Sequence, residues 1–214
     1  MKRQLFILIA LAAISIGHAQ TIGLETTEQF KEMVRYCCDL HPGAKRASID
    51  DCLPLLMRDG LERTTITTSP DSTLHHHHYP RLEGEDTVCL ILSTLRDTVY
   101  TVSGLLTSSD TTRAIALILQ ADTIQSEIAQ ELGCTRYNGS IKGAIGQFHR
   151  NHDQITALLA TATASQISQI SQTWRTPDGT ISVALTYRNP LLPNKKHTAT
   201  DRIQLTLTVT NTSN

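Results

Sequence analysis

Apolar residues recur at helical spacing near the start of the chain. Four apolar side chains between Phe30 and Cys37 fall on one face of a helix. Thr26 or Thr27 can cap this helix, which we expect to run to about Asp39. The first element of the fold is therefore predicted to be an amphipathic helix.

A second helix is predicted to begin at Ser48 and to end at Gly60. Ser48 and Asp51 have the spacing of a capping box, in which each side chain binds the backbone N–H of the other residue. Pro54 lies in the first turns, where a proline is tolerated. Glycine is a common residue just after the last helical turn, which supports the end at Gly60.

After Gly60, the spacing of apolar residues shortens to every second position, which is typical of strands. Residues 63–68 are rich in threonine and predict a short strand. Residues 87–95 predict a central strand because both of its faces are apolar, and residues 99–106 predict its partner after a tight turn at Arg96-Asp97. Residues 113–119 fit either a strand or a helix.

A similar order follows in the second half of the chain. We expect a helix over residues 122–132, capped by Asp122, and a second helical region over about 140–162, broken near Asn151. A hairpin is expected around the turn at 176–179, and residues 203–209 alternate as a last strand.

Helix, helix and three or four strands are thus expected twice. The predicted fold class is α+β, with two tandem ααβββ(β) units whose helices pack on an antiparallel sheet. The units would cover residues 20–120 and 121–214, and an offset of 103 aligns Asp50–Leu56 with Asp153–Leu159. Two such units can share one sheet and so hide an edge that each alone would expose.

The first 19 residues resemble a removable export signal. Lys2 and Arg3 precede an apolar run over residues 5–16, and Gly17-His18-Ala19 supplies small residues for cleavage before Gln20. A membrane span needs about 20 apolar residues, so this run is too short to be an anchor, and no later segment is longer. We expect an exported protein of the periplasm or the extracellular space.

Charge and composition then exclude some classes of function. The 19 basic and 20 acidic residues give a formal net charge of −1, which becomes −3 once Lys2 and Arg3 are removed. Nucleic-acid binding needs clustered cations and is not expected. Aromatic residues make up 4% of the chain, so a platform for stacking bases or sugars is not expected either.

Five triplets of Asp, Ser or Thr, and a small or aliphatic residue resemble the O-glycosylation signal of Bacteroidetes-type bacteria. Composition alone predicts about one such triplet. Asp-Thr pairs also occur at turns and helix starts, because the Asp side chain accepts backbone N–H bonds. The candidate acceptors are Ser72, Thr87, Thr98, Thr111 and Thr123.

The five cysteines are an odd number, which leaves at least one thiol outside any intramolecular disulfide. Cys38 and Cys52 lie on the two neighbouring predicted helices, so a disulfide between them is possible. Paired spacings such as C-x2-C, which are typical of zinc sites, do not occur. Cys89 lies in a predicted strand, where a buried thiol is expected.

The histidine tract His75–His78 is the most unusual local feature. Four neutral imidazoles could hold Zn, Ni or Cu in what is expected to be a loop between Pro70 and Pro80; a solvated polar loop is the alternative. His149 and His152, followed by Asp153, could place two ligands on one helical face. No other cofactor is expected.

Two helices followed by an antiparallel sheet, in duplicate, resemble the architecture of β-lactamase inhibitor protein. Each unit is also similar to the small lipoproteins of the outer-membrane barrel-assembly machinery. The resemblance implies a non-catalytic module that binds another protein. It transfers no functional residues, because this chain lacks the aromatic binding face and the lipid-modified cysteine.

We therefore expect an exported binding protein of the bacterial envelope, whose partner is another envelope or extracellular protein. Recognition would use an exposed sheet face or the loops at His75–His78 and Asn189–Asp201. A metal-binding protein is the first alternative. A secreted hydrolase is the second, although the G-x-S-x-G motif and a phosphate-binding glycine loop are absent.

Overall fold

Nine strands form one antiparallel sheet in the described part of the chain. The computed structural model describes residues 27–38, 40, 46–58, 60–69, 73–83, 86–144, 146–192 and 196–213. The strand order is β1-β2-β3-β4-β9-β8-β7-β5-β6. The bounds are β1 Thr65–Thr68, β2 Leu74–Glu83, β3 Asp86–Leu95, β4 Thr98–Ser108, β5 Arg136–Gly143, β6 Gly146–Arg150, β7 Ile167–Arg175, β8 Ile181–Arg188 and β9 Ile203–Asn211.

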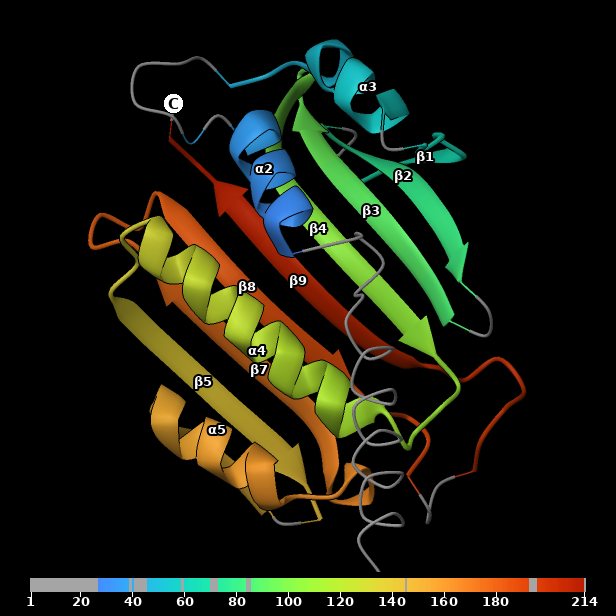
Figure 1. The fold of residues 1–214 in the computed structure, drawn as a ribbon, viewed down its shortest axis with the longest axis vertical. Coiled ribbons are helices and arrows are strands. Elements are labelled where there is room, and N and C mark those ends of the chain that lie inside the picture. Colours follow the sequence, from blue (N-terminus) through green and yellow to red (C-terminus); the bar gives the residue numbers. More distant parts are fainter. Residues whose placement is uncertain are drawn as a thin grey trace, which may run out of the picture.

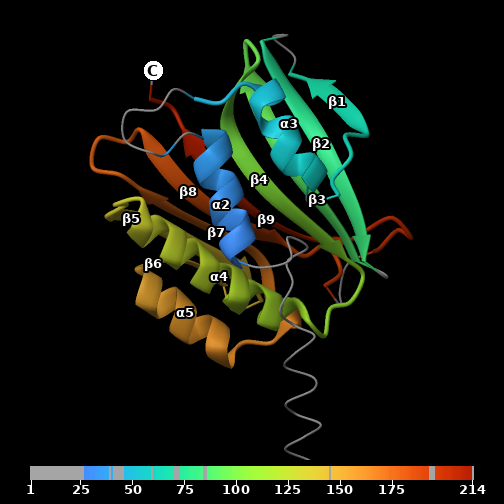
Figure 2. The same ribbon diagram turned by 45° about the horizontal axis from the view of Figure 1, so that its top comes forward.

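The described α-helices all cover the same face of this sheet (Figures 1 and 2). Helix α2 packs over β4 and β9, α4 packs over β8, and α5 packs over β5. The opposite face carries no described helix. The helices are α2 Thr27–Cys38, α3 Ile49–Arg58, α4 Ala114–Glu131 and α5 His152–Thr161, and a 3-10 turn, η1, spans Ala164–Gln166.

Strand alternation assigns each side chain to a face. In β9, Ile203, Leu205, Leu207 and Val209 are all buried against the helices, whereas the residues between them point to the uncovered face. The register extends this assignment across the sheet, because directly opposed residues of antiparallel strands share a face. The predicted α+β class, with helices on an antiparallel sheet, is confirmed.

In the first half, the buried face of α2 and the start of α3 agree with the sequence prediction. Phe30, Met33, Val34 and Cys37 of α2 are all buried. The Asp51 carboxylate accepts from the Ser48 N–H at 3.0 Å and the Asp51 N–H donates to Ser48 Oγ at 3.2 Å, which confirms the capping box.

The turn between β3 and β4 is also as expected. Arg96 and Asp97 both have positive φ, at 51° and 64°, which suits a tight hairpin turn. The Asp97 carbonyl accepts from the Ile49 N–H at 2.9 Å and so holds the start of α3 against the turn.

The second half departs from the prediction. Helix α4 begins at Ala114, so Asp122 lies inside the helix rather than at its cap. Residues 140–143 and 146–150 form strands rather than a helix, because β5 pairs with β7 and β6 closes a hairpin on its other side. The helix that remains is α5, which starts after Asn151 with a complete capping box.

Gly143 allows β5 to pass close to the backbone at Gln166. A side chain here would collide with the Gln166 carbonyl, so the close approach of β5 to η1 requires glycine. Both Gly143 and Gly146 fall within the region of about 140–162 that the sequence predicted to be helical. Gly146 has a φ of 104°, which is typical of a glycine in a hairpin turn.

The tandem repeat is not confirmed. Among the described residues, the first half has two helices and then four strands, whereas the second has a helix, a hairpin, a helix and three strands. The two halves do share one sheet, because β4 pairs with β9 from Thr101–Thr210 to Ser108–Ile203. Within the described residues, none of the helices has the length and apolarity needed to cross a bilayer.

Candidate functional site

The histidine tract lies in strand β2, between β1 and β3, so the predicted loop is wrong. Each imidazole contacts a hydroxyl group on a neighbouring strand. The pairs are His75 with Thr68 (3.2 Å), His76 with Ser93 (2.8 Å), His77 with Thr94 (3.1 Å) and His78 with Thr67 (3.0 Å). These contacts give the four rings a structural role in joining the first three strands.

Strand geometry splits the tract between the two faces. His77 points toward the helices with Leu92, whereas His76 and His78 point to the uncovered face. Burial, followed by the charge of Arg63, lowers the pKa of His77. Burial and then His76 lower the pKa of His78. Because His75 and His77 lie on one face of the strand and His76 and His78 on the other, a single metal ion could reach at most two of the four imidazoles.

Within the described ranges, no group of three or more His, Cys, Asp or Glu residues could hold a metal ion. His149 lies in β6 and His152 in α5, so the two do not share a helical face as predicted. The His152 ring instead packs against Tyr137 and Trp174, with centroid separations of 5.4 Å to each.

The cysteines are free thiols in the structure, which therefore does not contain the Cys38–Cys52 disulfide that the sequence makes possible. Cys52 hydrogen-bonds to Cys37, and this contact and burial raise the pKa of Cys37. Cys38 contacts the Val209 carbonyl at 3.9 Å, and burial raises its pKa to about 12. Cys89 is half-buried on the uncovered face.

The candidate glycosylation residues occupy varied positions. Thr87 lies at the start of β3, Thr98 begins β4 and Thr111 precedes α4, and all three are half-buried. Thr123 is exposed on α4, although its hydroxyl donates to the Leu119 carbonyl at 3.0 Å. Ser72 lies outside the described residues. Glycosylation of these residues stays a prediction.

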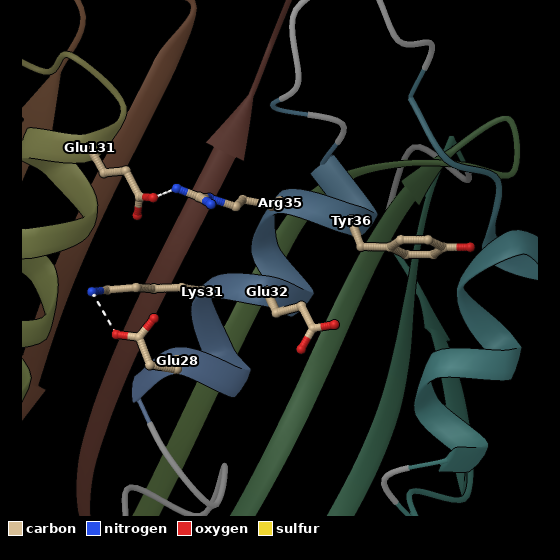
Figure 3. A pocket seen from close by; sticks show the side chains of 6 residues that line it. All are labelled: Glu28, Lys31, Glu32, Arg35, Tyr36 and Glu131. Carbon is tan, nitrogen blue, oxygen red and sulfur yellow. Dashed lines mark hydrogen bonds and ion pairs between the residues drawn. The ribbon is translucent and has the colours of Figure 1, made fainter.

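A groove of about 300 Å³ separates α2 from α4 on the helix-covered side (Figure 3). It is lined by Glu28, Lys31, Glu32, Arg35, Tyr36 and Glu131. Its cations are matched by carboxylates: Arg35 pairs with Glu131, and Lys31 Nζ lies 3.3 Å from Glu28 and 3.1 Å from Glu127.

The environment of Lys31 shows how complete this matching is. Burial alone would lower the pKa of Lys31, but hydrogen bonds and charge from Glu127 and Glu28 outweigh burial and raise the pKa. A groove whose charges are already neutralised offers little attraction to an ionic ligand. We therefore regard the α2–α4 groove as a joint between the two helices.

A second polar cluster lies beneath α4 and α5. The buried Asp122 carboxylate accepts from Gln172 Nε2 at 2.8 Å and from Thr156 Oγ1 at 2.9 Å, and lies 3.1 Å from His152 Nε2. Tyr137 donates to Gln172 Oε1 at 2.5 Å. Burial, with the charge of Asp122, raises the pKa of Tyr137.

This cluster contains Asp, His and Ser but does not have the geometry of a catalytic triad. Ser126 Oγ and Asp122 Oδ1 both meet His152 at the same ring atom, Nε2, each at 3.1 Å. A proton relay needs the carboxylate at one ring nitrogen and the nucleophile at the other. The cluster instead ties both helices to β5 and β7.

The uncovered face of β5, β7 and β8 has a different character. These strands place four outward positions each in register, and cations occupy both ends of the array. We call this array the basic strip. Its members are Arg136, Asn138, Ser140 and Lys142 on β5, Gln169, Ser171, Thr173 and Arg175 on β7, and Ser182, Ala184, Thr186 and Arg188 on β8.

Like charges meet directly at one end of the basic strip. Arg136 of β5 lies opposite Arg175 of β7, and both side chains are exposed. Like charges opposed across antiparallel strands destabilise a sheet. Ion pairs within the described part of the chain do not involve Arg136, Arg175, Lys142 or Arg188.

The other end of the basic strip opens into a groove of about 370 Å³. Three cations line it, and Asp201 is its one acidic lining residue. The lining residues are Lys142, Ser168, Gln169, Arg188, Asn189, Pro190, Lys196 and Asp201. The groove therefore carries an excess of positive charge, and it includes part of the Asn189–Asp201 loop that the sequence singled out.

The sequence pattern did not predict a binding role for Arg136, Lys142, Arg175 and Arg188. Residues 140–150 were expected to be helical, so Lys142 could not be placed on a sheet face. A usable signal was present, because polar residues alternate from Arg136 to Lys142 and from Gln169 to Arg175. The opposition of Arg136 and Arg175 follows from long-range pairing that the sequence alone does not supply.

The chain matches no protein-family model, and neither the curated proteins nor the solved structures include a significant match. The resemblance to β-lactamase inhibitor protein thus stays an expectation from element order. The geometry of the helix-covered and uncovered faces of the sheet is the remaining guide to function.

Proposed function

We propose that the protein is an exported, non-catalytic binding protein that recognises its partner with the uncovered face of the sheet. One observation carries this proposal: the described helices all cover one face, while the other presents an extended surface of hydroxyl, amide and basic side chains. An uncovered sheet of this size offers a broad, rigid docking surface. Export rests on the leader pattern in residues 1–19.

Retention of a component from the envelope fraction by the immobilised protein tests this use of the face. Thr186→Glu places a carboxylate on the exposed middle of the basic strip, whereas Ala157→Glu places the same group on the exposed side of α5. We expect the first variant to lose the retained component and the second to keep it. Equal retention by both variants, or none by the native protein, would contradict the proposal.

The metal-binding alternative rests on His76 and His78, which share the uncovered face two residues apart. Calorimetric titration with Zn and Ni tests it. Micromolar binding that is lost in the His76→Ala/His78→Ala variant would favour this alternative. Binding that is absent or weaker than millimolar would remove it.

A further inference from the structure

We infer that the basic strip binds an acidic polysaccharide laid along the strands, an inference that rests on the proposed use of the uncovered face. Charge gives the first argument. Arg136 and Arg175 lie at one end and Lys142 and Arg188 at the other, and the outward positions of β5, β7 and β8 carry no carboxylate. A partner must supply the negative charge that the strip lacks.

The two carboxylates beyond the ends of the strip already have local partners. Asp178, in the β7–β8 turn, accepts from Thr176 and Thr180, and these hydrogen bonds lower its pKa. Asp201 accepts from the Thr198 N–H at 2.8 Å, which lowers its pKa, with His197 and Arg188 as lesser causes. Arg136, Arg175 and Lys142 thus remain available to a ligand, and Asp201 interacts with Arg188 only as a lesser partner.

Spacing gives the second argument. Lys142 lies six residues after Arg136, which is about 20 Å along an extended strand. The two cationic ends therefore suit a linear polymer that carries acidic groups at intervals. The groove beside Lys142 and Arg188, with Lys196 at its rim, would hold one acidic residue of that polymer.

The middle of the strip gives the third argument. Between the cations lie Asn138, Ser140, Ser171, Thr173 and Thr186, whose amide and hydroxyl groups both donate and accept hydrogen bonds. Sugar hydroxyls have the same dual character. Polar rows between two cationic ends match a charged carbohydrate better than a simple anion.

The same composition argues against other polyanions. Protein partners are usually anchored by buried aromatic or aliphatic side chains, and Ala184 is the one aliphatic residue of the strip. Single-stranded nucleic acids need aromatic side chains for base stacking, and the strip has none. A neutral sugar would also need aromatic side chains to stack on, whereas an acidic sugar can be held by its charge. The sequence favoured a protein partner, whereas the composition of the strip favours an acidic polysaccharide.

The experiment measures binding of the purified protein to polygalacturonate and to dextran sulfate at low salt. Dextran is the neutral control, and poly-L-glutamate and oligothymidylate represent the other polyanions. The test variants are Arg136→Glu/Arg175→Glu and Lys142→Glu/Arg188→Glu. The control is Arg58→Glu/Arg96→Glu, which changes the net charge equally at exposed positions of α3 and the β3–β4 turn.

We expect at least one acidic polysaccharide to bind, dextran not to bind, and Kd to rise about tenfold or more in each test variant. The control should stay within about twofold of the native protein, and added salt should weaken binding because the contacts are ionic. Circular dichroism verifies that each variant is folded.

Three results would overturn the inference: no binding of either acidic polysaccharide, equal binding by the test and control variants, or tighter binding of poly-L-glutamate or oligothymidylate. If neither acidic polysaccharide binds while Thr186→Glu still abolishes retention of an envelope component, this inference fails and the proposed function stands.

Discussion

On the helix-covered side of the sheet, Arg35 of α2 meets Glu131 of α4 and Lys31 lies between Glu28 and Glu127, whereas on the uncovered side Arg136 lies opposite Arg175. Both regions are rich in charge and both border a groove. They differ in whether the chain itself supplies the counter-charge.

This difference separates groups that hold the fold together from groups that are free to bind. Charges that are matched within the chain tie elements to each other and attract external ions weakly. Charges that face like charges cost some stability, so their presence on an accessible surface favours a role in binding. Four changes test the contrast, from the largest expected effect on stability to the smallest.

Asp122→Ala should give the largest effect. The buried carboxylate accepts from Gln172 and Thr156. Its loss leaves Gln172 Nε2 without this acceptor under α4, whereas the Thr156 hydroxyl keeps its hydrogen bond to the His152 carbonyl. We expect the free energy of unfolding in urea to fall by about 3 kcal/mol. Thr156→Val removes one of these bonds and should cost about 1 kcal/mol. Equal costs for the two variants would show that the carboxylate is not the centre of the cluster.

The buried His77 should make stability depend on pH. Burial and Arg63 lower its pKa in the folded state, so below pH 6.5 the unfolded chain takes up a proton that the folded chain resists. Stability should therefore decline as the pH falls from about 7 toward 5, and His77 should contribute nothing to this slope at higher pH.

Urea titrations at several pH values measure this effect. His77→Gln should reduce the slope between pH 7 and 5, whereas His197→Gln, in an exposed loop, should leave it unchanged. An identical slope in the native protein and His77→Gln would contradict the role given to burial.

Arg35 and Glu131 should contribute little to stability although they close the α2–α4 joint. Their side chains are 42% and 33% exposed, so water screens the pair. A double-mutant cycle with Arg35→Gln and Glu131→Gln should give a coupling of about 0.5 kcal/mol. A coupling above about 2 kcal/mol would mean that the joint is a main source of stability.

Arg175→Gln should have the smallest effect, and one of opposite sign. Removing one of two opposed arginines relieves repulsion, so we expect the free energy of unfolding to rise by about 0.3 kcal/mol. Binding of an acidic polysaccharide should weaken at the same time. A clear loss of stability would show that Arg175 supports the fold instead.

The sequence predicts α2, α3 and the β3–β4 hairpin of the first half because the signals for these elements are local. Apolar spacing places α2, the Ser48–Asp51 capping box starts α3, and Arg96-Asp97 makes the turn after β3. Each of these features is determined by residues close together in the chain.

The sequence predictions fail where the secondary structure depends on pairing between strands that are distant in the chain. His75–His78 form a strand because β1 and β3 flank them, and residues 140–143 and 146–150 form strands because β5 pairs with β7 and with β6. Asp122 has the residue type of a helix cap, but its partners Gln172 and Thr156 lie far along the chain. The basic strip was missed for the same reason, since its like-charge opposition exists only once the strands pair.

Arginine-specific chemical modification, mapped by peptide mass with and without a bound acidic polysaccharide, tests the central claim most directly. The account predicts that the polysaccharide protects Arg136, Arg175 and Arg188 from modification and leaves Arg58 and Arg96 as reactive as before. Equal protection of all five arginines, or protection of Arg58 and Arg96 alone, would show that the uncovered face of β5, β7 and β8 is not the binding surface.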